Sequence, residues 1–208
     1  MADASRRAPL GRAFYERPTI AVAHDLLGKL LVRPRAGEPP QVARIVEVEA
    51  YLGVRDAASH ARRGPTPRAA IMFGPPGFLY VYLIYGMHHC MNLVTETDGV
   101  AGAVLIRAAA PLVGFDEDAG AGDRARNGNG NGRRGLLTGP GKLCAALSIT
   151  RALNGHDLTR PRELFVADDG SPAPRRARSA RIGVDYAGAW AARKLRFFDA
   201  LSPYVCSA

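Results

Sequence analysis

Hydrophobic and polar positions alternate over residues 42–52, a pattern typical of a β-strand that buries one face. An apolar stretch at 20–34 comes before it and ends at Pro34, because a proline stops the element that precedes it. The turn-rich residues between the two segments predict that they form a β-hairpin. Further β-prone runs predict a meander, at residues 78–85, 89–95 and 103–108.

The rest of the chain predicts short helices and strands between loops. Prolines punctuate residues 53–76 and leave room for one short helix near 68–73. A Gly-Pro-Gly run at 139–141 opens a helix that extends to about Ile149. Together the elements predict an α+β fold: a single compact domain with a mostly antiparallel, curved β-sheet, a protruding β-hairpin and peripheral helices. Short strands complete it near 163–167, 181–184 and 195–198.

Composition divides the chain into a short arm and one domain. With 208 residues, 47% of them hydrophobic, the chain can bury a core without a disulfide or a structural metal. Residues 1–15 carry arginines but no apolar signal segment, so we expect a flexible basic arm there and one domain at 16–208. Glycine, asparagine and charged residues dominate 116–135, which predicts a mobile loop.

A formal net charge of +9 indicates a polyanionic partner. Only three of the 28 basic residues are lysines, and the planar guanidinium of arginine suits bidentate phosphate contacts. Nucleic acid is the first interpretation, an anionic membrane surface the second, and the arginine bias of a GC-rich genome a neutral explanation. Three widely spaced cysteines favour a reducing compartment, and no apolar run is long enough to span a membrane.

The strand at 42–52 carries an unusual polar face. Side chains alternate along a strand, so Glu47, Glu49 and Tyr51 share one face. Acidic residues are poor strand formers, and two of them aligned with a tyrosine indicate either a functional site or an ordinary solvated face.

The segment after this strand carries a histidine and a group of arginines. His60 is followed by Arg62, Arg63 and Arg68, which lie among prolines. This arrangement favours a phosphate-facing loop, with a plain solvated surface as the alternative. A single histidine in a loop is more often a surface residue than a catalytic group.

Tyr82 and Tyr85 lie three positions apart on a predicted strand and therefore face opposite sides. Tyr82 can line a pocket, whereas Tyr85 stands beside the glycine where the hairpin turns. An aromatic wedge at a hairpin tip fills the gap left when a base leaves the duplex. A tyrosine stripe packed within a sheet would explain Tyr80 well and Tyr85 poorly.

Other chemistries find little support in the motifs. The adjacent His88 and His89 point to opposite sides of a strand, and no paired-cysteine or H-E-x-x-H spacing occurs, so we expect neither a metal nor another cofactor. A G-x-S-x-G elbow is also missing. The helix start at 139–142 offers free amides, together with Lys142, to an anion.

These segments resemble those of a known family and occur in its order. The similarity covers most of residues 27–203 and identifies the chain as a member of the alkyladenine (3-methyladenine) DNA glycosylase family, the mammalian type also found in bacteria. It implies a monofunctional enzyme without a required metal. The motifs are E-V-E-A-Y-L-G at 47–53, the histidine at 60, Y-V-Y-L-I-Y-G-M-H-H-C-M-N at 80–92, V-L-I-R-A at 104–108 and G-P-G-K-L-C at 139–144.

The resemblance implies roles for individual pocket residues. Glu49 matches the general base that activates water against the N-glycosidic bond. Tyr51, His60 and Tyr82 match the side chains that sandwich a flipped base. Asn92 matches the residue that disfavours the guanine amino group.

The resemblance also implies contacts with the DNA itself. Tyr85 matches the tyrosine that enters the minor groove in place of the flipped base, and Arg107 matches a basic residue near the phosphate of the target nucleotide. We expect further DNA contacts from four other basic side chains: Arg62, Arg63, Arg68 and Lys142.

The expected function is DNA repair on double-stranded DNA that contains damaged purines. The enzyme would flip an alkylated or deaminated purine, hydrolyse its N-glycosidic bond and leave an abasic site, as a monomer in the bacterial cytoplasm, associated with the nucleoid and with no membrane. A non-catalytic minor-groove binder of distorted DNA is the main alternative, and a hydrolase of free nucleosides is another. The sequence does not rank 3-methyladenine, 7-methylguanine, hypoxanthine and ethenoadenine as substrates.

Overall fold

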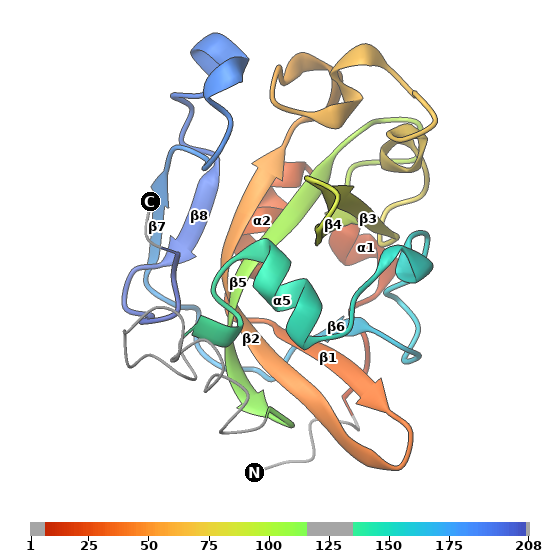
Figure 1. Cartoon of the computed structure of the whole chain (residues 1–208), viewed down its shortest axis with the longest axis vertical. Coiled ribbons are helices and arrows are strands. Elements are labelled where there is room, and N and C mark those ends of the chain that lie inside the picture. Colours follow the sequence, from red (N-terminus) through yellow and green to blue (C-terminus); the bar gives the residue numbers. More distant parts are fainter. Residues whose placement is uncertain (1–6, 116–134, 207–208) are drawn as a thin grey trace.

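The computed structural model describes residues 7–115 and 135–206, and a curved antiparallel sheet of eight strands forms its centre (Figure 1). Strands follow one another in the order β3-β4-β5-β2-β1-β6, while β8 pairs with both β2 and β7. The predicted α+β class is confirmed. The strands are β1 (Leu30–Arg35), β2 (Glu38–Tyr51), β3 (Leu79–Ile84), β4 (His88–Val94), β5 (Ala103–Val113), β6 (Phe165–Ala167), β7 (Arg176–Ser179) and β8 (Arg196–Asp199).

The long strand β2 carries the predicted acidic face through the middle of the sheet. One edge of β2 pairs with β5, and the other edge pairs first with β1 and then, from Glu47 to Glu49, with β8. The pairing with β5 shifts register on both sides of Glu47, and such bulges bend a strand and increase its twist. Paired on both edges, Glu47 and Glu49 are fully buried, which excludes a solvated face.

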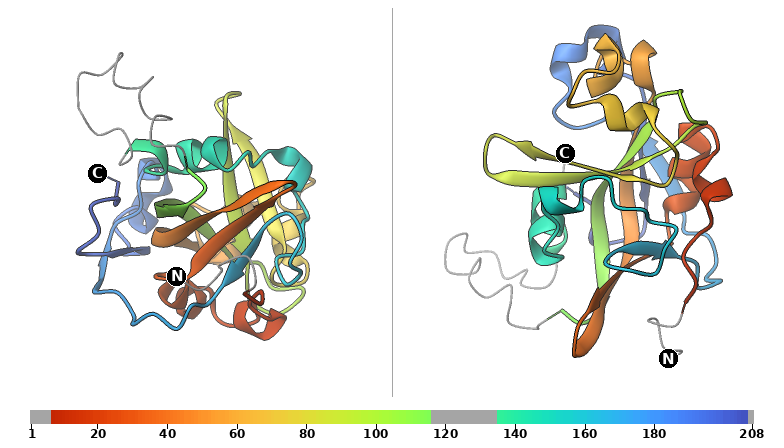
Figure 2. Two further views of the ribbon diagram at one scale, coloured as in Figure 1. Left: turned by 90° about the horizontal axis from the view of Figure 1, so that it is seen from below. Right: turned by 90° about the vertical axis from the view of Figure 1, so that its right-hand side faces the viewer.

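Helices cover both faces of this sheet. The helix α2 (Thr19–Leu26) packs on β2 and β5 behind the sheet, and α5 (Pro140–Ala146) packs on β4 and β5 in front of it (Figures 1 and 2). The hairpin of β3 and β4 projects from the body, as predicted (Figure 2). The other helices are α1 (Arg12–Tyr15) and the 3₁₀ turns η2 (Gly53–Arg55), η3 (His60–Arg63), η4 (Ala70–Phe73), η5 (Arg151–Leu153) and η6 (Asp185–Trp190).

The predicted hairpin is confirmed, because β1 and β2 pair antiparallel across the turn. Only the last part of the apolar stretch at 20–34 belongs to it, since Thr19–Leu26 is a helix. Val22, Ala23 and Leu26 form a buried helical stripe in α2, a 3.6-residue period that the continuous apolar run concealed. Pro34 lies within β1, where the register shifts between Arg33 and Arg35. A proline is tolerated at such an irregularity because no ladder hydrogen bond is needed from it.

Two other predictions differ from the structure. Residues 181–184 form no strand; β7 lies earlier, and 181–184 is an irregular connection that reaches the buried face of β2. The part of the predicted flexible arm that the structure describes is packed: Leu10 N donates to Val166 O, and Tyr15 in α1 is fully buried. The predicted loop at 116–135 lies outside the described residues except for its last position. No helix within the described ranges has the length and apolar character needed to cross a bilayer.

Candidate active site

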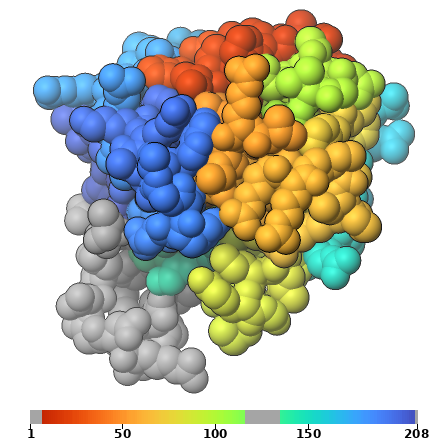
Figure 3. Space-filling model, turned by 90° about the horizontal axis from the view of Figure 1, so that it is seen from above, coloured from red at the N-terminus to blue at the C-terminus, as the bar shows by residue number. Residues whose placement is uncertain are grey.

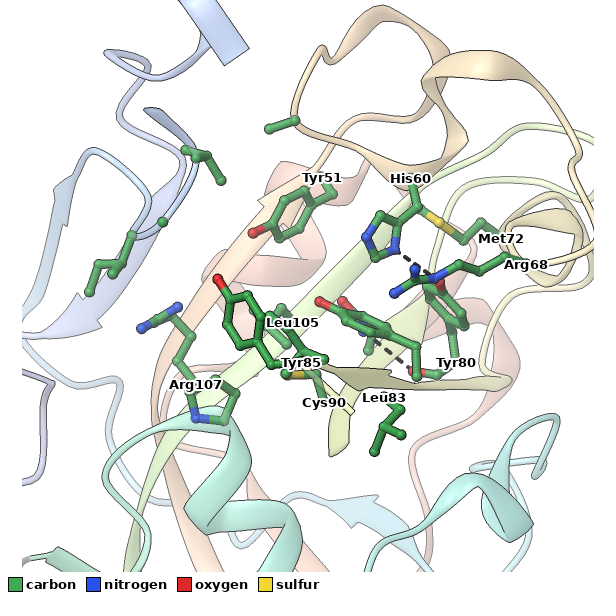
Figure 4. A pocket seen from close by; sticks show the side chains of 18 of the residues that line it. Tyr51, His60, Arg68, Met72, Tyr80, Leu83, Tyr85, Cys90, Leu105 and Arg107 are labelled. Atoms are coloured by element: carbon green, nitrogen blue, oxygen red, sulfur yellow. Dashed lines mark hydrogen bonds between the residues drawn. The ribbon is translucent and has the colours of Figure 1, made fainter. Parts of the chain in front are cut away.

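A cavity of about 360 Å³ lies at the carboxyl end of β2, where the hairpin and two loops meet (Figure 4). The η3 segment, the β3–β4 hairpin, β5 and the loop at 182–186 all contribute to its wall. Seen from above, the segment around 53–73 lies beside the segment around 180–190, with the hairpin tip next to them (Figure 3). Tyr85 lies at the mouth of the cavity. Six other predicted site residues also line it: Tyr51, His60, Arg68, Tyr82, Asn92 and Arg107.

Glu49 lies directly behind the wall of this cavity. Its Oε2 accepts a hydrogen bond from the Tyr51 hydroxyl (2.8 Å), and its Oε1 accepts one from Ile182 N (2.8 Å). The Nη1 of Arg107 lies 3.3 Å from the same Oε1. These three partners line the cavity, whereas Glu49 itself is fully buried.

The environment of Glu49 contains opposing influences on its ionisation. Burial raises the pKa of this carboxyl, while Arg107, Ile182 N and the Tyr51 hydroxyl oppose that shift. The three donors all favour the charged form, which is the form that a general base needs. The carboxylate is therefore held between burial, which favours its protonated form, and three donors, which favour its charged form.

Arg107 lies in an ion-pair network at the wall of the cavity. Arg107 lies between Ile106 and Ala108 and has no paired residue on β2, because the register of the two strands shifts there. A bulge of this kind redirects a side chain. Its Nε lies 3.0 Å from Glu47 Oε1, and Glu47 also accepts from Arg196 Nε at 2.7 Å. Arg107 is only 8% exposed. Its charge is therefore paired with the carboxylates of Glu47 and Glu49 inside the protein and does not lie on the outer surface.

Aromatic side chains form a slot on the other side of the cavity. The rings of His60 and Tyr82 meet edge-on with centroids 4.6 Å apart, and Tyr80 lies 5.3 Å from Tyr82. The His60 Nδ1 and the Tyr80 hydroxyl are hydrogen-bonded at 2.9 Å. Burial, reinforced by Arg68, lowers the pKa of His60 to about 4, so the imidazole is neutral near pH 7.

Asn92 and Tyr80 complete the floor of this slot. Asn92 on β4 is buried, and its Nδ2 donates to Tyr80 O at 3.3 Å across the strand pair. Tyr80 is buried in a packed cluster, as a tyrosine stripe within a sheet would be, and it also lines the cavity. The Tyr-Val-Tyr spacing already puts Tyr80 and Tyr82 on one face of β3, and this signal identifies it.

A buried ion pair supports the slot from behind and was not predicted. Arg181 and Asp56 make a two-point contact, with Nη2 to Oδ1 at 2.8 Å, and neither side chain is accessible to solvent. The Arg181 guanidinium lies 4.6 Å from the centroid of the Tyr51 ring. Arg181 also precedes Ile182, whose amide contacts Glu49. No local sequence signal joins Asp56 to Arg181, because they lie 125 positions apart.

The turn after β2 depends on a glycine. Gly53 has φ +68, and a Cβ there would lie 2.2 Å from the Ala101 carbonyl oxygen. Only glycine fits this close approach. The turn leads through η2 to η3, which brings His60 back over the end of β2.

The predicted DNA-contacting residues fall into two groups. Tyr85 is 85% exposed at the hairpin tip, with φ +53, and Gly86 follows with φ +70. Arg62 and Arg63 are exposed on η3, and Lys142 is exposed on α5, two residues after the cavity-lining Pro140. Arg62, Arg63 and Lys142 do not line the cavity, whereas Tyr85, Arg68 and Arg107 do.

A slot lined by aromatic rings, a carboxylate behind its wall and a large excess of arginine indicate the class of this protein: a hydrolase that acts on a base of nucleic acid. Comparison with protein families gives the same result. The model of the methylpurine-DNA glycosylase family matches residues 13–203, and the chain belongs to this family.

Individual proteins with similar sequences carry the same provisional name, 3-methyladenine DNA glycosylase. One from Methanocella arvoryzae is 52% identical over 197 residues, covering 94% of each chain. One from Myxococcus xanthus is 46% identical over 94% of this chain and 92% of its own, and one from Legionella pneumophila is 45% identical over 94% and 97%. The predicted family and the expectation of a hydrolytic DNA glycosylase are confirmed, which removes the non-catalytic binder.

Proposed function

We propose that this enzyme flips an alkylated or deaminated purine out of double-stranded DNA into the aromatic slot and hydrolyses its N-glycosidic bond. The observation that carries the proposal is the position of Glu49, which is fully buried behind the slot and held by three donors from the cavity wall. Burying a charged carboxylate costs free energy, so a carboxylate that is kept in this position is expected to have a function there.

The chemical step uses the carboxylate as a base. A water oxygen bonds to C1′ of the flipped nucleotide, one water proton moves to Glu49, and the electrons of the C1′–N9 bond leave with the purine. The sugar carries positive charge as the bond breaks, and the Glu49 carboxylate stabilises it. His60 stacks on the base, and burial together with Arg68 favours its neutral form by lowering its pKa.

Binding of the base follows from the slot and the hairpin. Tyr51, His60 and Tyr82 offer ring surface for stacking, worth about 1–3 kcal/mol per base. Asn92 faces the cavity and would crowd the amino group of guanine. Tyr85 at the exposed tip fills the gap in the duplex. We also propose that the enzyme acts as a monomer on chromosomal DNA.

Identification of released bases tests this function directly. Duplexes with a single 3-methyladenine, 7-methylguanine, hypoxanthine or ethenoadenine would be incubated with the enzyme, and free bases identified by mass spectrometry. We expect release from duplex DNA and not from the matching free nucleosides, which lack the phosphates that the arginines bind. Release from none of the duplexes would refute the proposal.

Replacing Tyr85 by alanine is expected to slow excision from a well-paired lesion about tenfold. The side chain is exposed, so the loss falls on retention of the flipped base rather than on folding. Extrusion costs least at a mismatch, and a mismatched lesion should therefore lose less. Single-turnover rates on both duplexes measure this. Leu201→Ala, also exposed (71%) but outside the lining of the cavity, is the control and should keep the wild-type rates. Equal losses on both duplexes would contradict the wedge role.

Replacing Tyr51 by phenylalanine is expected to move the acidic limb of the pH–rate profile to higher pH. The Tyr51 hydroxyl donates to the charged form of Glu49 and so opposes the rise that burial imposes on its pKa. Without this bond the pKa rises further, and Glu49 is protonated and inactive at a higher pH. Single-turnover rates between about pH 5 and 8 give the profile. Tyr80→Phe, which removes a hydroxyl bonded to His60, should leave the limb in place.

A further inference from the structure

Arg68 places a cation against a stacking ring of the slot. Its guanidinium carbon lies 4.9 Å from the centroid of the Tyr82 ring, and its charge opposes the rise that burial imposes on the pKa of the Tyr80 hydroxyl. In Figure 4 the guanidinium lies beside His60, on the side of the slot away from Tyr51. The slot is thus bordered by a positive charge before any base enters.

The other cations at the cavity are neutralised. Arg107 is shared by two carboxylates at 3.0 and 3.3 Å, and Arg181 is paired with Asp56. Across the part of the chain that the structure describes, no carboxylate oxygen lies within 4.0 Å of Arg68. Of the two arginines that line the cavity, Arg68 is therefore the one whose positive charge is not balanced by a carboxylate.

His60 experiences this field. Burial is the larger cause of its lowered pKa, and Arg68 lowers that pKa further by repelling a second positive charge. A purine lying between the same rings would meet the same repulsion if it carried a positive charge.

We propose that Arg68 sets the charge preference of the slot: it disfavours cationic purines such as 7-methylguanine and favours neutral purines such as hypoxanthine. A base stacked about 5 Å from the Tyr82 centroid lies at most about 10 Å from the guanidinium, a separation comparable to the screening length in physiological salt. This proposal rests on the proposed function, because it requires the flipped base to occupy the slot.

The bond-breaking step does not by itself discriminate between the two kinds of base. Each base takes the electron pair of the C1′–N9 bond, so a neutral purine becomes negative and a cationic purine becomes neutral, and the guanidinium assists both changes alike. The preference therefore arises when the flipped base enters the slot, where a cationic purine is repelled and a neutral one is not. Loss of the Arg68 charge should therefore raise the release of cationic bases relative to neutral ones.

A phosphate contact is the competing role for Arg68, since its side chain is exposed and lies in an arginine-rich segment. Such a contact positions the DNA but does not distinguish one base from another. Loss of such a contact would weaken binding to every duplex by the same factor. A saturating excess of enzyme would hide this weaker binding, because all of the DNA would still be bound.

The test is a ratio of two single-turnover rates measured with saturating enzyme. Excision of 7-methylguanine is divided by excision of hypoxanthine from otherwise identical duplexes, for the wild type and for Arg68→Gln. We expect this ratio to rise about tenfold in the variant, from the loss of one charge at this distance. An unchanged ratio, or equal losses for both bases, overturns the proposal.

Three further variants make the result specific. Arg63→Gln removes an exposed arginine of the same segment that does not line the cavity, and should keep the wild-type ratio. Arg68→Lys retains a charge and should stay within about threefold of the wild-type ratio. Arg68→Met retains the aliphatic stem and repeats the test if glutamine disturbs the loop. A wild type that releases neither base contradicts the proposed function, whereas release of both with an unmoved ratio contradicts only the role of Arg68.

Discussion

Replacement of Glu49 by glutamine is expected to lower single-turnover excision by about 100- to 10,000-fold while leaving affinity for lesion-bearing duplex almost unchanged. Glutamine keeps the size and one acceptor oxygen of the side chain but cannot take a proton from water or stabilise positive charge on the sugar. The lost interactions exist only in the transition state, so the rate falls and ground-state binding does not.

The measurements are an excision rate under saturating enzyme and an equilibrium titration of a fluorescent duplex at a fixed salt concentration. Glu163→Gln, an exposed glutamate paired with Arg33 far from the cavity, is the matched control and should match the wild type in both. A melting midpoint of Glu49→Gln close to that of the wild type would show that the variant is folded, with Arg107 still paired to Glu47. A folded variant with wild-type turnover would remove Glu49 from the reaction.

The position of Glu49 was predictable because alternation along a strand is a local property. The pattern at 42–52 put Glu49 and Tyr51 on one face, and their side chains are hydrogen-bonded at 2.8 Å. The exposed wedge position of Tyr85 was likewise predictable from the adjacent glycine and the hairpin pattern. Such features depend on neighbours within a few residues, so the sequence contains them.

Features that depend on distant partners were not predictable. The contact of Arg107 with a DNA phosphate stays a prediction, but its ion pairs with Glu47 and Glu49, set by the bulge in β5, could not be predicted. Arg181 appeared to belong to a strand, yet its side chain pairs with Asp56 across the fold. Since arginine serves surface, phosphate and buried ion pairs equally well, only tertiary structure distinguishes these uses.

Arg181→Met is the second change with a large expected effect, a loss of about 3–5 kcal/mol in the free energy of unfolding. Arg181 and Asp56 have no solvent-accessible side-chain surface. Removing the cation leaves the Asp56 carboxylate buried, with only the amides of Leu52 and Ala58 as donors. For a chain of this length the melting midpoint should fall on the order of 10 °C.

Two controls separate this ion pair from a general effect of losing an arginine. Arg193 lies 3.8 Å from the Trp190 ring but is exposed, so Arg193→Met should cost less than about 1 kcal/mol. In the double variant Asp56→Asn, Arg181→Met, the orphaned charge is gone, and the cost should be smaller than the sum of the single costs. Additive costs in chemical denaturation would show that the two side chains do not act as a pair.

Excision should fall together with stability in Arg181→Met. Without the ion pair, the Tyr51 ring loses the guanidinium beside it, and Ile182 loses its anchor beside Glu49. The reason for the expected loss is that this ion pair ties two loops to the carboxylate that we propose as the general base.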